Sequence, residues 1–188
     1  MYGRYMNRVF LYIDGRNFFY GLRSIHPTYT DLHFDFVKFS RLITGSTWKD
    51  RVLQRIYYYN APLKKQVNLG LFKEQQRLFS RLYSDPLVTL RLCKLVGRTD
   101  DEGVQRFDTK GDDIWIACDM LQDANNDAFD IAILVSCDGD FLKLVEYVQR
   151  LQKCVENAYF IGQGSIALRK QCNDIIGIGP ELIEECIV

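Results

Sequence analysis

The sequence predicts an α/β fold in which a mainly parallel central sheet is covered by helices on both faces. Strand-like apolar runs alternate with amphipathic helical segments along the chain. Two of the strand-like runs, residues 9–13 and 129–135, are strongly apolar, which is typical of strands buried on both faces of a parallel sheet. The chain has 188 residues, 47% of them hydrophobic, so it can bury the core of one domain spanning residues 1–188.

The expected strands are segments rich in β-branched and aromatic residues, or segments in which apolar and polar residues alternate. Residues 51–60 contain three consecutive tyrosines, and residues 87–96 alternate apolar with polar side chains. In chain order, the expected strands are residues 9–13, 51–60, 87–96, 129–135, 154–161 and 174–178.

The expected helices are segments whose apolar residues recur every three or four positions. Leu71, Leu78 and Leu82, for example, fall on one side of a helix whose other sides are charged. In chain order, the expected helices are residues 17–24, 34–43, 69–83, 112–123, 141–151 and 165–172. Residues 97–110 are polar and charged and are expected to form a loop.

The net charge is zero, but the charges are strongly segregated. Residues 51–98 carry 10 basic and 2 acidic side chains, whereas residues 99–140 carry 2 basic and 12 acidic ones. Such blocks are consistent with solvated helix faces. They are equally consistent with carboxylates gathered for a metal ion beside a basic surface for phosphates.

Several classes of protein are disfavoured by composition. The longest apolar runs are far shorter than the roughly 20 residues of a membrane-spanning helix, and residues 9–13 are too short for a signal-peptide core. The six cysteines are widely spread and include no C-x-x-C pair, so we expect thiols in a reducing cytoplasm and neither a disulfide framework nor a zinc site.

Aspartates are concentrated next to the two most apolar strands. Asp14 ends the first strand, Asp138 and Asp140 follow the strand 129–135, and Asp112 and Asp113 open the helix before that strand. In a parallel sheet these positions can converge at one edge, where ligands bind in such folds. Clustered carboxylates need a counter-charge, and Mg²⁺ or Mn²⁺, as one ion or two, is the usual solution with oxygen ligands. We therefore expect at least one of Asp14, Asp138 and Asp140 to titrate above its ordinary pKa.

Each aspartate also has a purely structural interpretation. Asp14 and Asp138 are suited to helix caps or turns, and Asp112 and Asp113 would complement a helix dipole. Other motifs fit less well: Phe141 follows Asp140 where haloacid-dehalogenase phosphatases need Thr or Val, and the first strand is not followed by a glycine-rich dinucleotide fingerprint.

Taken in order, these segments resemble one known family over nearly the whole chain. Residues 12–17 (YIDGRN) resemble the opening hydrophobic-D-G-x-N motif of NYN domains, specifically the LabA-like branch of the PIN-like nuclease superfamily. Residues 110–114 (KGDDI) followed by Asp119, residues 136–141 (SCDGDF), and the set Ser165, Leu168 and Asp174 are similar to the later motifs of that family. This chain has Asp112 where the family often has an apolar residue, and Cys137 where glycine is common.

The resemblance implies a three-layer α/β/α sandwich, a carboxylate site for Mg²⁺ or Mn²⁺, and ribonuclease activity. It would make Asp14, Asp113, Asp138 and Asp140 the metal-site acids, with Asp112 competing with Asp113 for this role and Asp119 a secondary acid. Asn17 and Ser136 would orient a carboxylate or a water, and Lys110 would lie near the scissile phosphate.

The first functional hypothesis is therefore a metal-dependent endoribonuclease acting on RNA. Basic side chains of residues 51–98 would grip the RNA backbone, foremost Lys64, Lys65, Arg77, Arg81, Arg91, Lys94 and Arg98. Tyr57, Tyr58 and Tyr59 would stack on bases if exposed, but burial is expected for at least one or two of them. The alternatives are a regulatory RNA- or protein-binding module with little catalysis, and a small-molecule phosphohydrolase. The C-terminal Ile183, Ile187 and Val188 would be either core or a homodimer contact.

Overall fold

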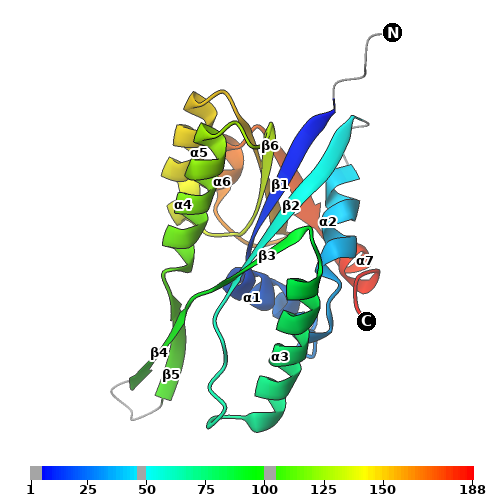
Figure 1. The fold of residues 1–188 in the computed structure, drawn as a ribbon, viewed down its shortest axis with the longest axis vertical. Coiled ribbons are helices and arrows are strands. Elements are labelled where there is room, and N and C mark those ends of the chain that lie inside the picture. The colour runs from blue at the N-terminus through cyan, green and yellow to red at the C-terminus, as the bar shows by residue number, and fades with distance from the viewer. Residues whose placement is uncertain (1–5, 46–49, 100–104) are drawn as a thin grey trace.

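The centre of the structure is a six-stranded sheet in which every pair of neighbouring strands is parallel. It is seen here in a computed structural model (Figure 1) that describes residues 6–45, 50–99 and 105–188, without the side chains of residues 98–99 and 105–110. The strand order is β3-β2-β1-β6-β7-β8. The strands are β1 (Asn7–Asp14), β2 (Arg51–Asn60), β3 (Val88–Leu92), β6 (Ile131–Val135), β7 (Cys154–Phe160) and β8 (Asp174–Ile178).

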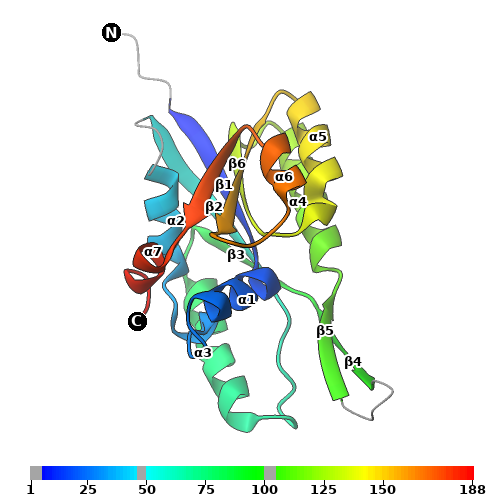
Figure 2. The ribbon, with the colours of Figure 1, turned by 180° about the vertical axis from the view of Figure 1, so that it is seen from behind.

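Helices cover both faces of this sheet, which makes the fold the predicted three-layer α/β/α sandwich. One face carries α1 (Gly15–Ile25), α2 (Phe36–Gly45), α3 (Leu69–Ser84) and α7 (Pro180–Glu184). The other face carries α4 (Asp112–Asn125), α5 (Leu142–Arg150) and α6 (Ile166–Gln171). Figure 2 shows α4, α5 and α6 gathered on one side of the strands and α2 and α7 on the other.

Aromatic rings fill both helix–sheet layers. Phe18 of α1 is fully buried, and its ring contacts four other phenylalanine rings with centroids 5.0–5.4 Å away. Successive side chains of a strand alternate between faces, so Tyr57 and Tyr59 enter one layer and Tyr58 the other. All three tyrosines are at most 3% exposed, so they serve the core and offer no ring for base stacking.

The segment 87–110 differs from its prediction. The single strand expected at residues 87–96 is two strands. The Cys93 N–H still donates to the carbonyl of Asn60, the last residue of β2, at 2.8 Å, and the chain then leaves the sheet. The loop expected at residues 97–110 contains antiparallel pairing between β4 (Lys94–Thr99) and β5 (Gln105–Lys110). Backbone hydrogen bonds hold this pair, so side-chain polarity gave no sign of it.

The C-terminal segment is divided between core and surface, because Ile187 and Val188 are 39% and 67% exposed. Ile183 on the short helix α7, which the sequence pattern did not predict, is fully buried. Ile187 forms an isolated bridge with Phe34, and the Val188 N–H donates to the His33 carbonyl at 3.0 Å. Within the described residues, every helix is too short or too polar to span a bilayer.

The strand order fixes where a ligand would bind. The chain leaves β1 toward β2 on one side, and β6 joins β1 on the other side. In open parallel sheets, the crevice at such a reversal lies beyond the carboxyl ends of the two strands. Asp14 ends β1, and Asp138 and Asp140 follow β6, so these three predicted aspartates lie at this crevice.

Gly21 of α1 packs closely against the Phe160 ring of β7. A Cβ at this position would lie 2.1 Å from the Phe160 ring, so we expect Gly21→Ala to destabilise the fold by about 1–3 kcal/mol through overpacking. Gly70→Ala on α3 is the matched control, because its Cβ would meet only an Asn68 oxygen at 3.4 Å. Chemical denaturation measures both. A Gly21→Ala variant as stable as Gly70→Ala would contradict the packing described here.

Candidate functional site

Asp14 joins the end of β1 to the start of α1. Its Oδ1 accepts a hydrogen bond from the Asn17 N–H at 2.9 Å and caps the helix, and its Oδ2 accepts from the Ser136 hydroxyl at 3.1 Å. The side chain is buried, with 4% exposure. The next residue, Gly15, has no room for a side chain, because a Cβ there would lie 2.3 Å from the Tyr59 carbonyl oxygen. The D-G-x-N motif therefore places a buried carboxylate against β2 and β6.

The loop after β6 is built around the same carboxylate. The Ser136 oxygen that donates to Asp14 also accepts from the Asp138 N–H at 3.1 Å. Asn17 accepts from the Cys137 N–H at 2.9 Å, so α1 holds this loop directly. Asp138 Oδ1 accepts from the Asp140 N–H at 3.0 Å and caps the short 3-10 turn Gly139–Phe141.

The first turn of α4 supplies two further acids. Gly111 begins the helix with a φ of 90°, a left-handed conformation that favours glycine. Asp112 is buried, with 6% exposure, and Asp113 is exposed. Lys110 ends β5, and its side chain lies outside the described residues.

Mutual repulsion shows that these acids are neighbours. Burial, together with the charges of Asp112 and Asp113, raises the pKa of Asp14 to about 7, although the hydrogen bonds from Asn17 and Ser136 lower it. The pKa of Asp113 is raised by burial and by the charges of Asp112, Asp138 and Asp140. The prediction that one of Asp14, Asp138 and Asp140 titrates high is confirmed for Asp14. We call Asp14, Asp112, Asp113, Asp138 and Asp140 the acidic cluster.

The cluster is not a closed metal cage. Among the described residues, no three or more acidic, cysteine or histidine side chains form a group ready to hold an ion. The donors are nonetheless all carboxylate oxygens, which suit Mg²⁺ or Mn²⁺. Mg²⁺ typically takes only one or two carboxylates and completes its shell with water and substrate phosphates. The residues therefore fit an ion that is bound together with a substrate.

Asp119 does not point into the cluster. Its carboxylate forms a two-pronged ion pair with Arg91, at 2.9 Å for each oxygen, and accepts from the Tyr59 hydroxyl at 2.9 Å. Both oxygens are thus used to tie α4 to β2 and β3. The secondary acid implied by the family resemblance is a structural residue in this conformation, and Arg91 is its partner.

The predicted basic residues do not form one surface beside the cluster. Lys64 and Lys65 are exposed on the segment between β2 and α3, on the cluster's side of the sheet edge. Arg77 is exposed on α3. Arg81 donates to the Leu32 carbonyl at 3.0 Å and lines a separate groove with Phe34 and Val188.

Two neighbours of the cluster were not assigned a role from sequence. Arg16 is exposed on the first turn of α1, and its charge lowers the pKa of Asp113, so this guanidinium lies near the acids. The sequence feature that could have identified Arg16 is its position inside the D-G-x-N motif. Cys93 is buried beside the cluster, and burial together with the charges of Asp112 and Asp14 raises its pKa to about 12. No motif or residue spacing in the sequence indicated that Cys93 lies near the cluster.

A sequence model of the NYN domain matches residues 8–179. The chain belongs to the NYN domain family. This match spans every member of the acidic cluster, and it supports a nuclease of the PIN-like type. A protein of unknown function from Vibrio parahaemolyticus, VPA0982, has a similar crystal structure, with a TM-score of 0.70, 22% identity and coverage of 100% of both chains. At that identity the likeness shows the fold alone. No curated protein matches the sequence significantly.

The raised pKa of Asp14 makes the stability of the NYN domain depend on pH. Because the folded-state pKa of about 7 exceeds the usual 3.8, the folded state holds this proton more tightly than the unfolded chain. The resulting stabilisation is full at low pH and is lost as the pH rises through about 7. We expect Asp14→Asn to gain about 1 kcal/mol or more relative to wild type between about pH 5 and pH 8 without metal.

Thermal unfolding in EDTA at the two pH values measures this difference. Asp85→Asn is the matched control, because Asp85 is a turn residue that accepts from the Leu87 N–H at 2.9 Å, away from the cluster. A difference between Asp14→Asn and wild type that does not change with pH would mean that Asp14 is already ionised in the folded protein.

Proposed function

We propose that this NYN domain is a metal-dependent ribonuclease of the LabA-like type that cleaves RNA phosphodiester bonds. The observation that carries the proposal is the acidic cluster at the crevice between β1 and β6. Its members come from three separate segments of the chain, and burial together with their charges raises the pKa values of Asp14 and Asp113. A divalent cation bound among these carboxylates would relieve the repulsion between their charges.

The proposed metal ligands are Asp14, Asp113, Asp138 and Asp140. Asp112 is buried behind Asp113 in the first turn of α4, and we propose that it mainly raises the negative potential of the site. Mg²⁺ or Mn²⁺ bound there would activate water and stabilise the leaving oxygen of the phosphodiester.

The remaining side chains would position these groups. Ser136 holds Asp14 and the Asp138 backbone in fixed relation, and Asn17 holds the Cys137 backbone. Arg16 lies near Asp113 and would bind a phosphate oxygen of the RNA. Lys64 and Lys65 would contact the strand beyond the site, and Lys110 would lie near the scissile phosphate, as its position in the motif implies.

One observation favours a second candidate, an RNA- or protein-binding module with little catalysis. The described residues lack a preformed group of three metal-ligating side chains, so the acidic cluster alone does not guarantee a catalytic ion. In this alternative, RNA or a partner protein would bind without being cut. The six free cysteines support a reducing, cytoplasmic location under either function.

Removing one metal ligand should abolish cleavage without unfolding the protein. We expect Asp14→Asn and Asp138→Asn each to lose Mn²⁺-dependent cleavage of a labelled single-stranded RNA, because each loses a ligand charge at nearly constant volume. Both variants should stay folded, since Asn also serves as a cap. Asp85→Asn should cleave like wild type. Full cleavage by both cluster variants would show that neither aspartate is a metal ligand required for the reaction.

Metal should stabilise the folded protein through the same residues. We expect millimolar Mn²⁺ or Mg²⁺ to raise the thermal midpoint of wild type, because the ion binds the folded state and not the unfolded chain. The shift should be smaller in Asp14→Asn and unchanged in Asp85→Asn. Calorimetry at matched ionic strength measures the shift, and an equal midpoint with and without metal would count against an ion site.

Arg16 should contribute to RNA binding and not to metal binding. We expect Arg16→Ala to weaken RNA binding and to reduce its dependence on salt, because one phosphate contact is lost. Lys143→Ala is the control, since Lys143 is 74% exposed on α5 and forms an ion pair with Glu146 at 2.8 Å. Filter binding in EDTA over a salt series measures both, and identical salt dependence for the two variants would remove Arg16 from the RNA contact.

A further inference from the structure

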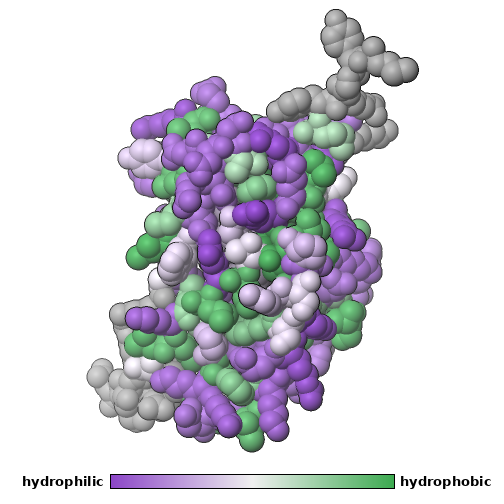
Figure 3. Space-filling view, viewed as in Figure 1, coloured by the Kyte–Doolittle hydropathy of each residue, from purple (hydrophilic) through white to green (hydrophobic). Residues whose placement is uncertain are grey.

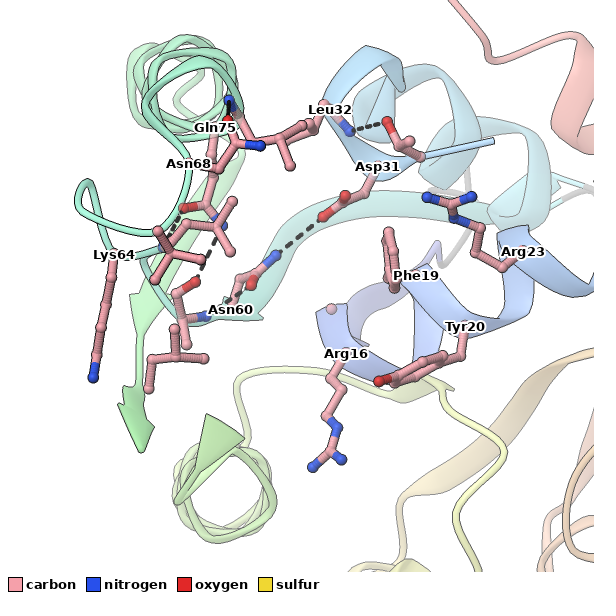
Figure 4. A pocket seen from close by; sticks show the side chains of 17 residues that line it. Arg16, Phe19, Tyr20, Arg23, Asp31, Leu32, Asn60, Lys64, Asn68 and Gln75 are labelled. Carbon is pink, nitrogen blue, oxygen red and sulfur yellow. Dashed lines mark hydrogen bonds between the residues drawn. The ribbon is translucent and has the colours of Figure 1, made fainter. Parts of the chain in front are cut away.

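A cavity of about 310 Å³ begins at the two residues that follow Asp14 of the acidic cluster. It lies between α1, the segment that joins β2 to α3, and the start of α3, as Figure 4 shows. Its volume falls at the small end of the range of ligand pockets, about 300–1,000 Å³. Gly15, the residue after Asp14, lines it, and so does Arg16, whose charge reaches Asp113. The acids of the cluster do not themselves line the cavity, so a ligand that reached both would be one longer than the cavity, such as a strand that passes Arg16.

The polar side chains of the cavity wall bond to one another. The buried Asp31 accepts from the Tyr58 hydroxyl at 2.6 Å and from the Asn60 amide at 3.1 Å, the second bond being drawn in Figure 4. Gln75 accepts from the Leu63 N–H at 2.7 Å and donates to the Ala61 carbonyl at 3.1 Å. These bonds make the wall rigid and occupy most of its polar groups.

The surface left for a ligand is aromatic and aliphatic. Phe19 and Tyr20 of α1 provide ring surface, and Leu63, Val67 and Leu71 provide aliphatic surface across from them. Tyr20, Val67 and Leu71 are 57%, 60% and 43% exposed, which is high for residues of this type. Figure 3 shows hydrophobic side chains gathered over the middle of the face where β2 and β3 end.

The rim of the cavity is cationic. Arg16, Arg23 and Lys64 are exposed there, and Asp31 is the one acid among the described lining residues. Figure 4 shows Arg16 and Lys64 extending outward from the wall on opposite sides. An apolar, partly aromatic interior with cations at its mouth suits a flat heterocycle that carries a phosphate. The guanidinium groups of Arg16 and Arg23 lie 6.0 Å and 5.3 Å from the ring centroids of Tyr20 and Phe19, so the cations and the rings form one surface.

We propose that this cavity receives one unpaired base of the RNA strand whose phosphate lies at the acidic cluster. The inference rests on the proposed function, because it takes RNA to be the substrate. The base would lie against Phe19 and Tyr20, and Arg16 would contact the phosphate between the base and the cluster. A base that is paired in a duplex cannot enter, so the cavity would select single-stranded RNA at this position.

The test uses binding, which does not depend on cleavage. Short single-stranded RNAs carry one 2-aminopurine, moved one position at a time, and its fluorescence and affinity are measured with the full-length protein in EDTA. Leu71→Glu places a carboxylate at the cavity mouth, and Leu69→Glu is the matched control. Both leucines are exposed in the first turn of α3, at 43% and 47%, but only Leu71 lines the cavity. Val67→Glu is a second cavity variant on a different segment.

For wild type and Leu69→Glu we expect a change in 2-aminopurine fluorescence at one position of the series. For Leu71→Glu and Val67→Glu we expect loss of that change and about tenfold weaker binding, within the range that one base–aromatic contact contributes. Affinity equal to that of Leu69→Glu in both cavity variants would overturn the proposal. A free 2-aminopurine nucleoside monophosphate that binds as tightly as the strand would also overturn it, since the cavity would then serve a free nucleotide.

The two proposals fail differently. Position-specific binding without Mn²⁺-dependent cleavage would support the base cavity and contradict the ribonuclease. Cleavage that is unchanged in Leu71→Glu and Val67→Glu, with unchanged affinity, would support the ribonuclease and contradict the base cavity.

Discussion

The hydrogen bonds of one buried carboxylate hold the centre of this structure together. Asp14 caps α1 through the Asn17 N–H and accepts from Ser136 beyond the end of β6. These two bonds connect the two halves of the sheet at the point where strand order reverses. The loop after β6 and the first turn of α1 therefore take positions that depend on each other, and Asn17 reinforces the link by accepting from the Cys137 N–H.

The structural and functional interpretations of the aspartates are compatible. Asp14 is a helix cap and Asp138 caps a 3-10 turn, as the structural interpretation expects. Both also lie in a cluster whose charges repel. The Asp138 cap uses only Oδ1. Each cap fixes a carboxylate in place and contributes a small amount to the stability of the fold. The charges of the cluster still repel one another, and a bound cation would relieve this repulsion.

The segregation of charge along the chain has two different outcomes in space. Part of the basic block neutralises part of the acidic block, as in the Arg91–Asp119 pair, which also holds Tyr59. Among the described side chains, Arg16, which lies outside both blocks in sequence, is a cation near the acidic cluster. The charge count along the sequence therefore identified a basic and an acidic block correctly. It did not show which basic side chains lie next to which acidic ones in the fold.

The sequence by itself determined the alternation of elements, the parallel sheet and the edge at which the aspartates collect. Long apolar and β-branched runs such as residues 9–13 specify buried strands, and parallel strands bring their carboxyl ends to one edge. Tertiary structure decided what depends on long-range contacts: the β4–β5 pairing, the burial of all three tyrosines, the ion pair of Asp119, and the cavity beside Arg16. Backbone pairing and cavity shape arise from segments that meet only in the fold, so no local pattern of residues could encode them.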